Sequence, residues 1–220
     1  MDVHVISKHD SILNTYLYEL RNQELQKNRM RFRKNIERMT QILCYEMSKS
    51  LVYKSKAVKT ELGNTFIDLP VQDLVICSVL RAGLSMHHMA LDYFDQADNA
   101  FISAYRKHDP GDHSKFEIII EYLACPDLNN KTLLLIDPML ASGKSLTMAY
   151  QALQHYGEPK QIRIISLIAA QAGVDYVDAN FPEHAELWLA ALDPELNDYG
   201  YIVPGLGDAG DLAFGEKLQH

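Results

Sequence analysis

The segment Ile136–Ser145 combines a carboxylate, small residues, hydroxyls and a lysine in a pattern suited to binding a phosphorylated sugar. Ala141, Ser142 and Gly143 let the backbone approach an anion closely, and a helix that begins after them presents N–H groups and the positive end of its dipole. Asp137 is suited to accept hydrogen bonds from a pair of sugar hydroxyls. The loop therefore predicts one site for a ribose and its phosphate.

The end of this segment also invites comparison with the P-loop of nucleoside triphosphatases, because Gly143, Lys144 and Ser145 follow one another. The P-loop pattern requires a glycine five positions before Gly143, and this chain has Pro138 there. Since proline has no N–H group to donate to a phosphate, a P-loop is the weaker interpretation.

Strands and helices must alternate along the chain to position this loop. Short apolar runs, each of strand length, lie at Leu74–Leu80, Thr132–Ile136, Ile162–Ile168 and Ala185–Leu192. Helix-length segments lie between or after them, at Leu84–Phe94, Ser145–Tyr156 and Val174–Asn180. Continuous apolar runs are typical of strands buried on both faces of a parallel sheet. We therefore expect an α/β fold, in which ligands bind beyond the carboxyl ends of the strands.

Two further segments lie outside this alternation. Residues from Asn22 to Ser50 contain no Gly or Pro, and their apolar side chains recur every three or four positions, which predicts an amphipathic helix. Residues 1–70 are accordingly expected to be a mainly helical N-terminal segment. Residues 100–122 predict a hairpin arm with a polar, mobile tip at 107–115.

The arm tip contains His108, Asp109, Asp112 and His113, which raises the alternative of a metal site. Their spacing matches neither a helical pair of ligands nor a zinc motif, so a solvated loop is the preferred interpretation.

Composition limits the remaining possibilities. The 220 residues suit a single domain spanning 1–220, and the net charge of −8 disfavours a broad nucleic-acid surface. Cys44, Cys77 and Cys125 form neither a disulfide framework nor a zinc signature. The chain opens without a secretory signal pattern and has no apolar run long enough to span a membrane. We therefore expect a cytoplasmic protein that binds neither nucleic acid nor membranes.

Three segments together resemble a known family. Asp137–Gly143 is similar to the loop with which phosphoribosyltransferases bind 5-phosphoribosyl 1-diphosphate (PRPP), in the form that uracil phosphoribosyltransferases use. Val79–Leu84 and Gly200–Asp211 match the same family, and the second is the most specific of the three. The resemblance extends over nearly the whole chain. It implies a mostly parallel sheet flanked by helices, of the type I phosphoribosyltransferase kind, with N-terminal helices and a β-hairpin arm.

The resemblance also implies roles for individual residues. The residues expected to bind PRPP are Arg81, Arg106, Asp137, Pro138, Met139, Leu140, Ala141, Ser142, Gly143, Lys144, Ser145 and Asp208. Those expected to bind uracil are Tyr201, Ile202, Gly207, Asp208 and Ala209, within a base-binding segment at 193–215. The catalytic set is Arg81, Arg106 and Asp208, and no metal site built from protein ligands alone is expected.

The implied reaction joins uracil to the ribose of PRPP and releases diphosphate, giving UMP for pyrimidine salvage. Its transition state resembles an oxocarbenium ion, so orientation and stabilisation of the leaving group take the place of a covalent nucleophile. Mg²⁺ is expected as a cofactor bound mainly through PRPP and water. The expected partners are uracil, PRPP and further copies of the chain, in a homodimer or a higher homo-oligomer.

Some positions depart from the usual family pattern, and other functions remain open. Ser142 replaces a more common threonine, Lys144 replaces a second glycine, and the arm tip is longer than usual. The alternatives are a phosphoribosyltransferase for another base, an RNA-binding regulator with this fold, and a non-catalytic subunit. The acidic balance disfavours the regulator, and the presence of Arg81, Arg106, Asp137 and Asp208 disfavours the non-catalytic subunit. No residues decide whether GTP regulates the chain.

Overall fold

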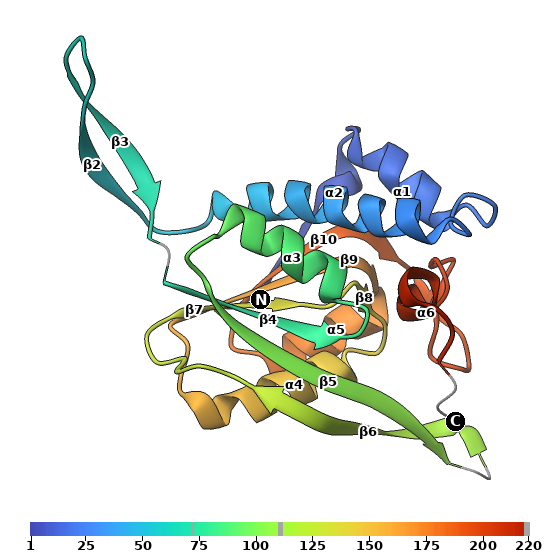
Figure 1. Cartoon of the computed structure of the whole chain (residues 1–220). Helices are drawn as coiled ribbons and strands as arrows, with labels where there is room; N and C mark the ends of the chain where they lie inside the picture. The colour runs from blue at the N-terminus through green and yellow to red at the C-terminus, as the bar shows by residue number, and fades with distance from the viewer. Residues whose placement is uncertain (72, 110–111, 218–220) are drawn as a thin grey trace.

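Eight strands form one sheet within the residues that the structure, a computed structural model, describes: 1–71, 73–109 and 112–217. The side chains of residues 104–118 lie outside that description. The strand order is β1-β10-β9-β7-β4-β5-β6, with β8 paired to β9 (Figure 1). The strands are β1 (Asp2–Val5), β4 (Leu74–Leu80), β5 (Asp98–Asp109), β6 (Asp112–Ala124), β7 (Thr132–Ile136), β8 (Met139–Leu140), β9 (Gln161–Ala170) and β10 (Glu186–Asp193).

Every neighbouring pair in this sheet is parallel except the hairpin β5–β6. Helices cover both faces, as Figure 1 shows. One face carries α1 (Leu13–Arg21), α2 (Arg29–Ser48) and α3 (Leu84–Tyr93), and the other carries α4 (Lys144–Leu153) and α5 (Gln171–Asn180). The short 3-10 turns Ile6–Lys8 and Gln154–Tyr156 follow β1 and α4. The prediction of a mostly parallel sheet flanked by helices is confirmed.

The central strands are apolar along their whole length because each face contributes to a separate core. On β4, Leu74 and Ile76 belong to the core beneath α2 and α3. Val75 and Cys77 point the opposite way, into the core shared with α4 and α5. This alternation follows from the two-residue period of a strand. The continuous apolar runs of the sequence thus reflect burial on two sides.

The N-terminal part of the chain differs from the prediction in three places. The long helix begins at Arg29 instead of Asn22, because the side chain of Asn28 caps it by accepting a hydrogen bond from the Arg31 N–H. Residues 2–5 form β1 at the edge of the sheet. Residues 53–70 form a separate hairpin of β2 (Tyr53–Lys59) and β3 (Asn64–Pro70) that projects from the body (Figure 1).

The missed strands share a physical reason. Most residues of β2 and β3 are exposed on both faces, so the hairpin has no buried side that would leave an apolar pattern in the sequence. β1 is four residues long, too short for a periodic signal. Residues 1–70 therefore contain three strands besides the predicted helices.

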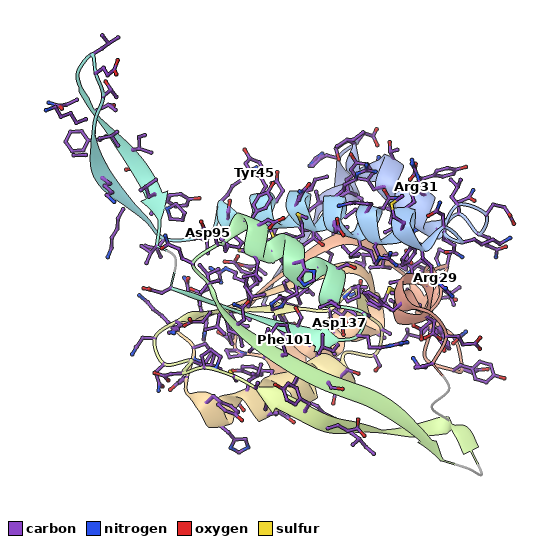
Figure 2. The ribbon with its side chains drawn as sticks, viewed as in Figure 1. Arg29, Arg31, Tyr45, Asp95, Phe101 and Asp137 are labelled. Atoms are coloured by element: carbon purple, nitrogen blue, oxygen red, sulfur yellow. The ribbon has the colours of Figure 1, made fainter. Side chains whose placement is uncertain are left out.

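A carboxylate joins α1 to α2. Glu19 accepts hydrogen bonds from Nε and Nη2 of Arg31, at 2.8 and 2.5 Å, and from Nδ2 of Asn35 at 2.6 Å. Figure 2 shows Arg31 on α2. These donors favour the charged form of the acid, and the bonds from Arg31 lower the pKa of Glu19 to about 2.

We predict that Glu19→Gln destabilises the chain most above the ordinary pKa of a glutamate. Because folding depresses this pKa, the ionised Glu19 contributes its full stability above about pH 4.5 and loses it as the pH falls toward about 2. Urea unfolding at several pH values measures the difference between the parent and the variant. That difference should shrink on acidification. A gap that stays constant down to pH 2.5 contradicts the assignment, and Glu24→Gln, in an exposed pair with Lys27, is the control.

Candidate active site

Two turns meet at the carboxyl edge of the sheet because β4 and β7 are parallel neighbours. Ser78 pairs with Ile136, so the turn after Leu80 and the loop after Ile136 leave the sheet side by side. A Cβ added at Gly83 would lie 3.3 Å from the Ile136 carbonyl oxygen, which shows how closely the turn approaches β7. The structure thus brings the predicted Arg81 turn and the predicted Asp137 loop together.

The loop after β7 is anchored to β9 before it reaches the helix. The Pro138 carbonyl accepts hydrogen bonds from the N–H groups of Leu167 and Ile168, at 3.2 and 3.1 Å. Met139 and Leu140 form the short strand β8 beside β9. Asp137 lies at the start of this loop (Figure 2), and its Oδ1 accepts a hydrogen bond from the Met139 N–H at 3.3 Å. A loop fixed in this way presents a preformed backbone surface.

Helix α4 begins at Lys144, one residue before the predicted start, and ends at Leu153, where a 3-10 turn continues to Tyr156. The left-handed conformation falls on Gly143, with φ 77°. Lys144 is exposed and helical, so it needs only ordinary backbone angles where the family more often has glycine. The replacement of that glycine is therefore compatible with the loop.

Gly173, at the start of α5, packs against the candidate loop, although no motif in the sequence marks it. A Cβ at this position would lie 2.2 Å from the Ala141 carbonyl oxygen and 2.8 Å from that of Leu140. Conversely, a Cβ added at Gly143 would lie 2.9 Å from the Gly173 carbonyl oxygen. Backbone therefore packs directly on backbone beneath the loop. The only signal in the sequence is the small-residue composition of Ala169–Gly173.

Arg81 contacts the C-terminal segment. Its Nη2 donates to Asp211 Oδ1 at 3.0 Å and to the Gly215 carbonyl oxygen at 3.1 Å, and the side chain is 45% exposed. Asp211 lies in helix α6 (Ala209–Phe214), which Figure 1 shows beside the carboxyl edge of the sheet. A turn that follows β4 is thus tied to residues 130 positions later. No local pattern in the sequence predicts this role of Asp211.

Asp208 caps α6. Its Oδ1 accepts a hydrogen bond from the Asp211 N–H at 3.0 Å, and its Oδ2 accepts one from Lys217 Nζ at 3.1 Å. Burial tends to raise the pKa of Asp208, but the bonds from the Asp211 and Gly210 N–H groups and the Lys217 ammonium outweigh it and lower the pKa. Asp208 is therefore ionised at neutral pH.

The predicted base-binding residues lie in a segment that folds over this edge. Two short strands, β11 (Glu195–Leu196) and β12 (Ile202–Val203), form a hairpin. Ile202 and Ala209 are buried in the same core as Ala82 and Ala141, whereas Tyr201 and Gly207 are exposed. The segment thus packs against both turns of the site.

Arg106 is placed only by its backbone. It lies in β5 opposite Ile118 of β6, which confirms the hairpin arm. Its side chain falls outside the described residues, as do those of the arm-tip histidines and aspartates at 108–113. No group of three or more His, Cys, Asp or Glu side chains that could hold a metal ion occurs in the part of the chain that the structure describes.

The chain matches known proteins along its length. A family model described as uracil phosphoribosyltransferase matches residues 6–216. A uracil phosphoribosyltransferase of Porphyromonas gingivalis (strain ATCC BAA-308 / W83) is 47% identical over 98% of this chain and 99% of its own length. One from Pyrococcus furiosus is 35% identical over 92% of this chain and 86% of its own length.

A solved structure shares the fold. The AQ2163 protein from Aquifex aeolicus superposes with a TM-score of 0.85 and 27% sequence identity, and the match covers 99% of this chain and 100% of that one. The two chains therefore have the same architecture from end to end.

We predict that Gly173→Ala disturbs the loop after β7. The added methyl group would overlap the Ala141 carbonyl, so the loop must move, at a cost of about 1–3 kcal/mol in the free energy of unfolding. Thermal unfolding and calorimetric titration with PRPP measure the two effects, and we expect lower stability and weaker binding. Gly63→Ala is the matched control, since a Cβ there meets nothing within 4 Å. Equal behaviour of the two variants would refute the prediction.

Proposed function

The chain belongs to the uracil phosphoribosyltransferase family, and we propose that the turns assembled at the carboxyl edge of its sheet are the site of that family's reaction. The chain is a pentosyltransferase that joins uracil to the ribose of PRPP, giving UMP for pyrimidine salvage and diphosphate. Its fold is of the type I phosphoribosyltransferase kind. The observation that carries the site is the meeting of three segments distant in sequence, at Val79–Leu84, Asp137–Gly143 and Gly200–Asp211, at one edge.

The loop after β7 would hold the ribose and its 5-phosphate. Residues 141–145 offer backbone N–H groups at the start of α4, where the positive end of the helix dipole favours an anion. The Ser142 and Ser145 hydroxyls would add donors. Asp137, at the end of β7, would accept hydrogen bonds from the ribose hydroxyls. The anchoring of Pro138 to β9 supports this role, because a loop that is already fixed loses little conformational entropy when it binds a ligand.

Arg81 and Arg106 would bind the diphosphate. Arg81 is nearly half exposed, and its present partners are one carboxylate oxygen and one carbonyl oxygen. A diphosphate would offer that guanidinium stronger, bidentate acceptors. Arg106 lies in the strand β5, which is the parallel neighbour of β4, so its backbone lies in the strand next to the one that ends at the Arg81 turn.

Uracil would lie against the C-terminal segment. The base carries carbonyl acceptors and N–H donors, which backbone groups at Ile202, Gly207 and Ala209 would pair. Gly207 is exposed, and a Cβ there would meet only the Leu212 Cδ1 atom, at 3.6 Å, which supports a close approach of the base. The exposed ring of Tyr201 would lie beside the base.

The reaction needs no covalent nucleophile. A uracil nitrogen attacks C1 of the ribose and releases its proton, while the bond from C1 to diphosphate breaks; Arg81 and Arg106 would stabilise the negative charge that grows on the leaving group. Mg²⁺, when bound, supplies further positive charge to the diphosphate. The ionised Asp208 fits such an ion, as a single carboxylate that would act together with PRPP oxygens and water.

The production of UMP from PRPP, Mg²⁺ and uracil tests the function, with cytosine, hypoxanthine and orotate as competing bases. We expect UMP and diphosphate with uracil, and no turnover with the other three. Turnover with another base in place of uracil would overturn the assignment of residues 202–209. A folded protein that converts none of the four bases would contradict the proposal as a whole.

We predict that Arg81→Ala lowers kcat/KM on the order of 100-fold, because it removes charge that is most needed in the transition state. Steady-state kinetics with uracil and PRPP measure the loss. Arg38→Ala is the control, since Arg38 contacts only Asn35 and the Tyr16 ring among the contacts described for it. A variant at Arg81 that matches the control removes this residue from the catalytic set.

The proposal includes assembly into a homodimer or a higher homo-oligomer. The hairpin β2–β3 exposes large apolar side chains to solvent: Leu62 is 99% exposed and Phe66 is 72% exposed. Large apolar side chains exposed on a projecting hairpin support a protein contact there. The hairpin projects from the body on the side opposite α6 (Figure 1), so such a contact would leave the site open.

We predict that the parent chain sediments as a dimer or a larger assembly, and that Phe66→Asp shifts it toward the monomer, because a buried charge disfavours an apolar interface. Sedimentation velocity over a range of concentrations measures this. Tyr156→Asp, at an exposed tyrosine of the main body, is the control. A parent chain that sediments as a monomer would contradict the proposed assembly.

The proposed location is the cytoplasm. Cys44, Cys77 and Cys125 are all free thiols, as a reducing compartment requires. Among the described residues, no helix is long and apolar enough to cross a membrane.

A further inference from the structure

Asp193 and Arg21 form a paired site beneath the C-terminal segment. Asp193 ends β10, and only 5% of it is exposed. Its Oδ1 accepts a hydrogen bond from Arg21 Nη2 at 2.7 Å, and its Oδ2 accepts one from Arg21 Nη1 at 2.8 Å. Two parallel bonds between a guanidinium and a carboxylate fix both groups in one orientation.

The pair binds both backbone polar groups of one residue of the C-terminal segment, Gly205. Asp193 Oδ2 also accepts a hydrogen bond from the Gly205 N–H at 2.9 Å, and Arg21 Nη1 donates to the Gly205 carbonyl oxygen at 3.1 Å. The donor and the acceptor of Gly205 are thus both satisfied by one ion pair. The segment is held here by side chains from α1 and β10.

Gly205 is suited to this contact by its conformation. Its φ is 57°, and a Cβ there would lie 2.2 Å from the Ile202 carbonyl oxygen. The chain therefore turns back on itself at Gly205. Ile202 and Gly207, both proposed to meet uracil through their backbone, are three and two residues away. Fixing Gly205 in a tight turn sets the positions of both, since each trans peptide spans only about 3.8 Å.

We infer that Arg21 and Asp193 are positioning residues for uracil: they act on the base through the backbone of Gly205, without touching the substrate. The inference rests on the proposed base-binding role of the 193–215 segment. Arg21 lies at the end of α1, and Asp193 lies outside the loop after β7 and the turn after β4. The pair therefore acts on uracil more directly than on PRPP, whose proposed contacts lie mostly in the loop after β7 and the turn after β4.

The first test is steady-state kinetics of Asp193→Asn and Arg21→Ala, with each substrate varied in turn. We expect the KM for uracil to rise on the order of 10- to 100-fold, because a small displacement of the base-binding backbone weakens a correctly oriented complex. The KM for PRPP should change much less than the KM for uracil. Arg21→Lys keeps the charge without the bidentate contact, so it should recover part of the loss seen in Arg21→Ala.

The matched control is Arg31→Ala. Arg31, on α2, forms a second bidentate pair with Glu19, which lies on α1 as Arg21 does. This pair joins α1 to α2 and has no contact with Gly205 among those described for it. Loss of this pair measures the purely structural effect of freeing α1. We expect Arg31→Ala to lower the stability while the KM for uracil stays at the parent value.

A second measurement does not depend on activity. Hydrogen exchange of the peptide that contains Gly205 should accelerate in Arg21→Lys, whereas that of the β7 peptide at 132–136 should not. This exchange measurement on Arg21→Lys therefore tests the positioning role even if Asp193→Asn fails to fold.

The possible failures can be told apart. A parent chain that makes no UMP from uracil refutes the proposed function itself. An active parent whose Arg21 and Asp193 variants raise both KM values equally, or behave like Arg31→Ala, refutes the positioning role alone. Unchanged exchange at Gly205 in Arg21→Lys has the same consequence.

Discussion

Parallel pairing in a sheet buried on both faces is the constraint on which the rest of the structure depends. The register of β7 against β4 and β9 places the ends of these strands at one edge, so the turn after Leu80 and the loop after Ile136 must leave together. A slip of one residue would move every side chain of a strand into the opposite core. The two apolar cores therefore fix the site as well as the fold.

The C-terminal segment needs a different kind of support, because it lies outside the main sheet. Besides the apolar packing of Ile202 and Ala209 in the core, polar contacts hold it: Arg81 with Asp211 on one side, and the Arg21–Asp193 pair with Gly205 on the other. Asp193 is close to this segment in sequence, but Arg81 and Arg21 lie at least 130 residues before the residues that they contact. The N-terminal helix α1, which offers no catalytic group, thus helps to shape the side of the site assigned to the base.

Local patterns in the sequence predict much of this arrangement. Continuous apolar runs predict the central strands. The loop from Asp137 to Ser145 combines small residues, hydroxyls and charge, and these residue types alone predict a site for a ribose and its phosphate. The helices at Leu84 and Lys144 follow from segment length and from the turns before them. Resemblance to a family then assigns roles that composition and periodicity do not give.

The features that the sequence did not reveal depend on contacts between distant residues. Gly173 is needed only because Ala141 passes 2.2 Å from the place of its missing Cβ, and Arg21 meets Asp193 across 172 positions. Neither leaves a local pattern. The β2–β3 hairpin was missed for the opposite reason, because strands exposed on both faces carry no hydrophobic alternation.

The central claim is that the three segments at this edge form a single site for PRPP and uracil. A crystal structure of the chain with Mg²⁺, uracil and an unreactive PRPP analogue tests it most directly. We predict the 5-phosphate at residues 141–145, the ribose hydroxyls at Asp137, the diphosphate at Arg81 and the base against residues 202–209. Ligands bound at another edge of the sheet, or a base held away from the C-terminal segment, would contradict the account.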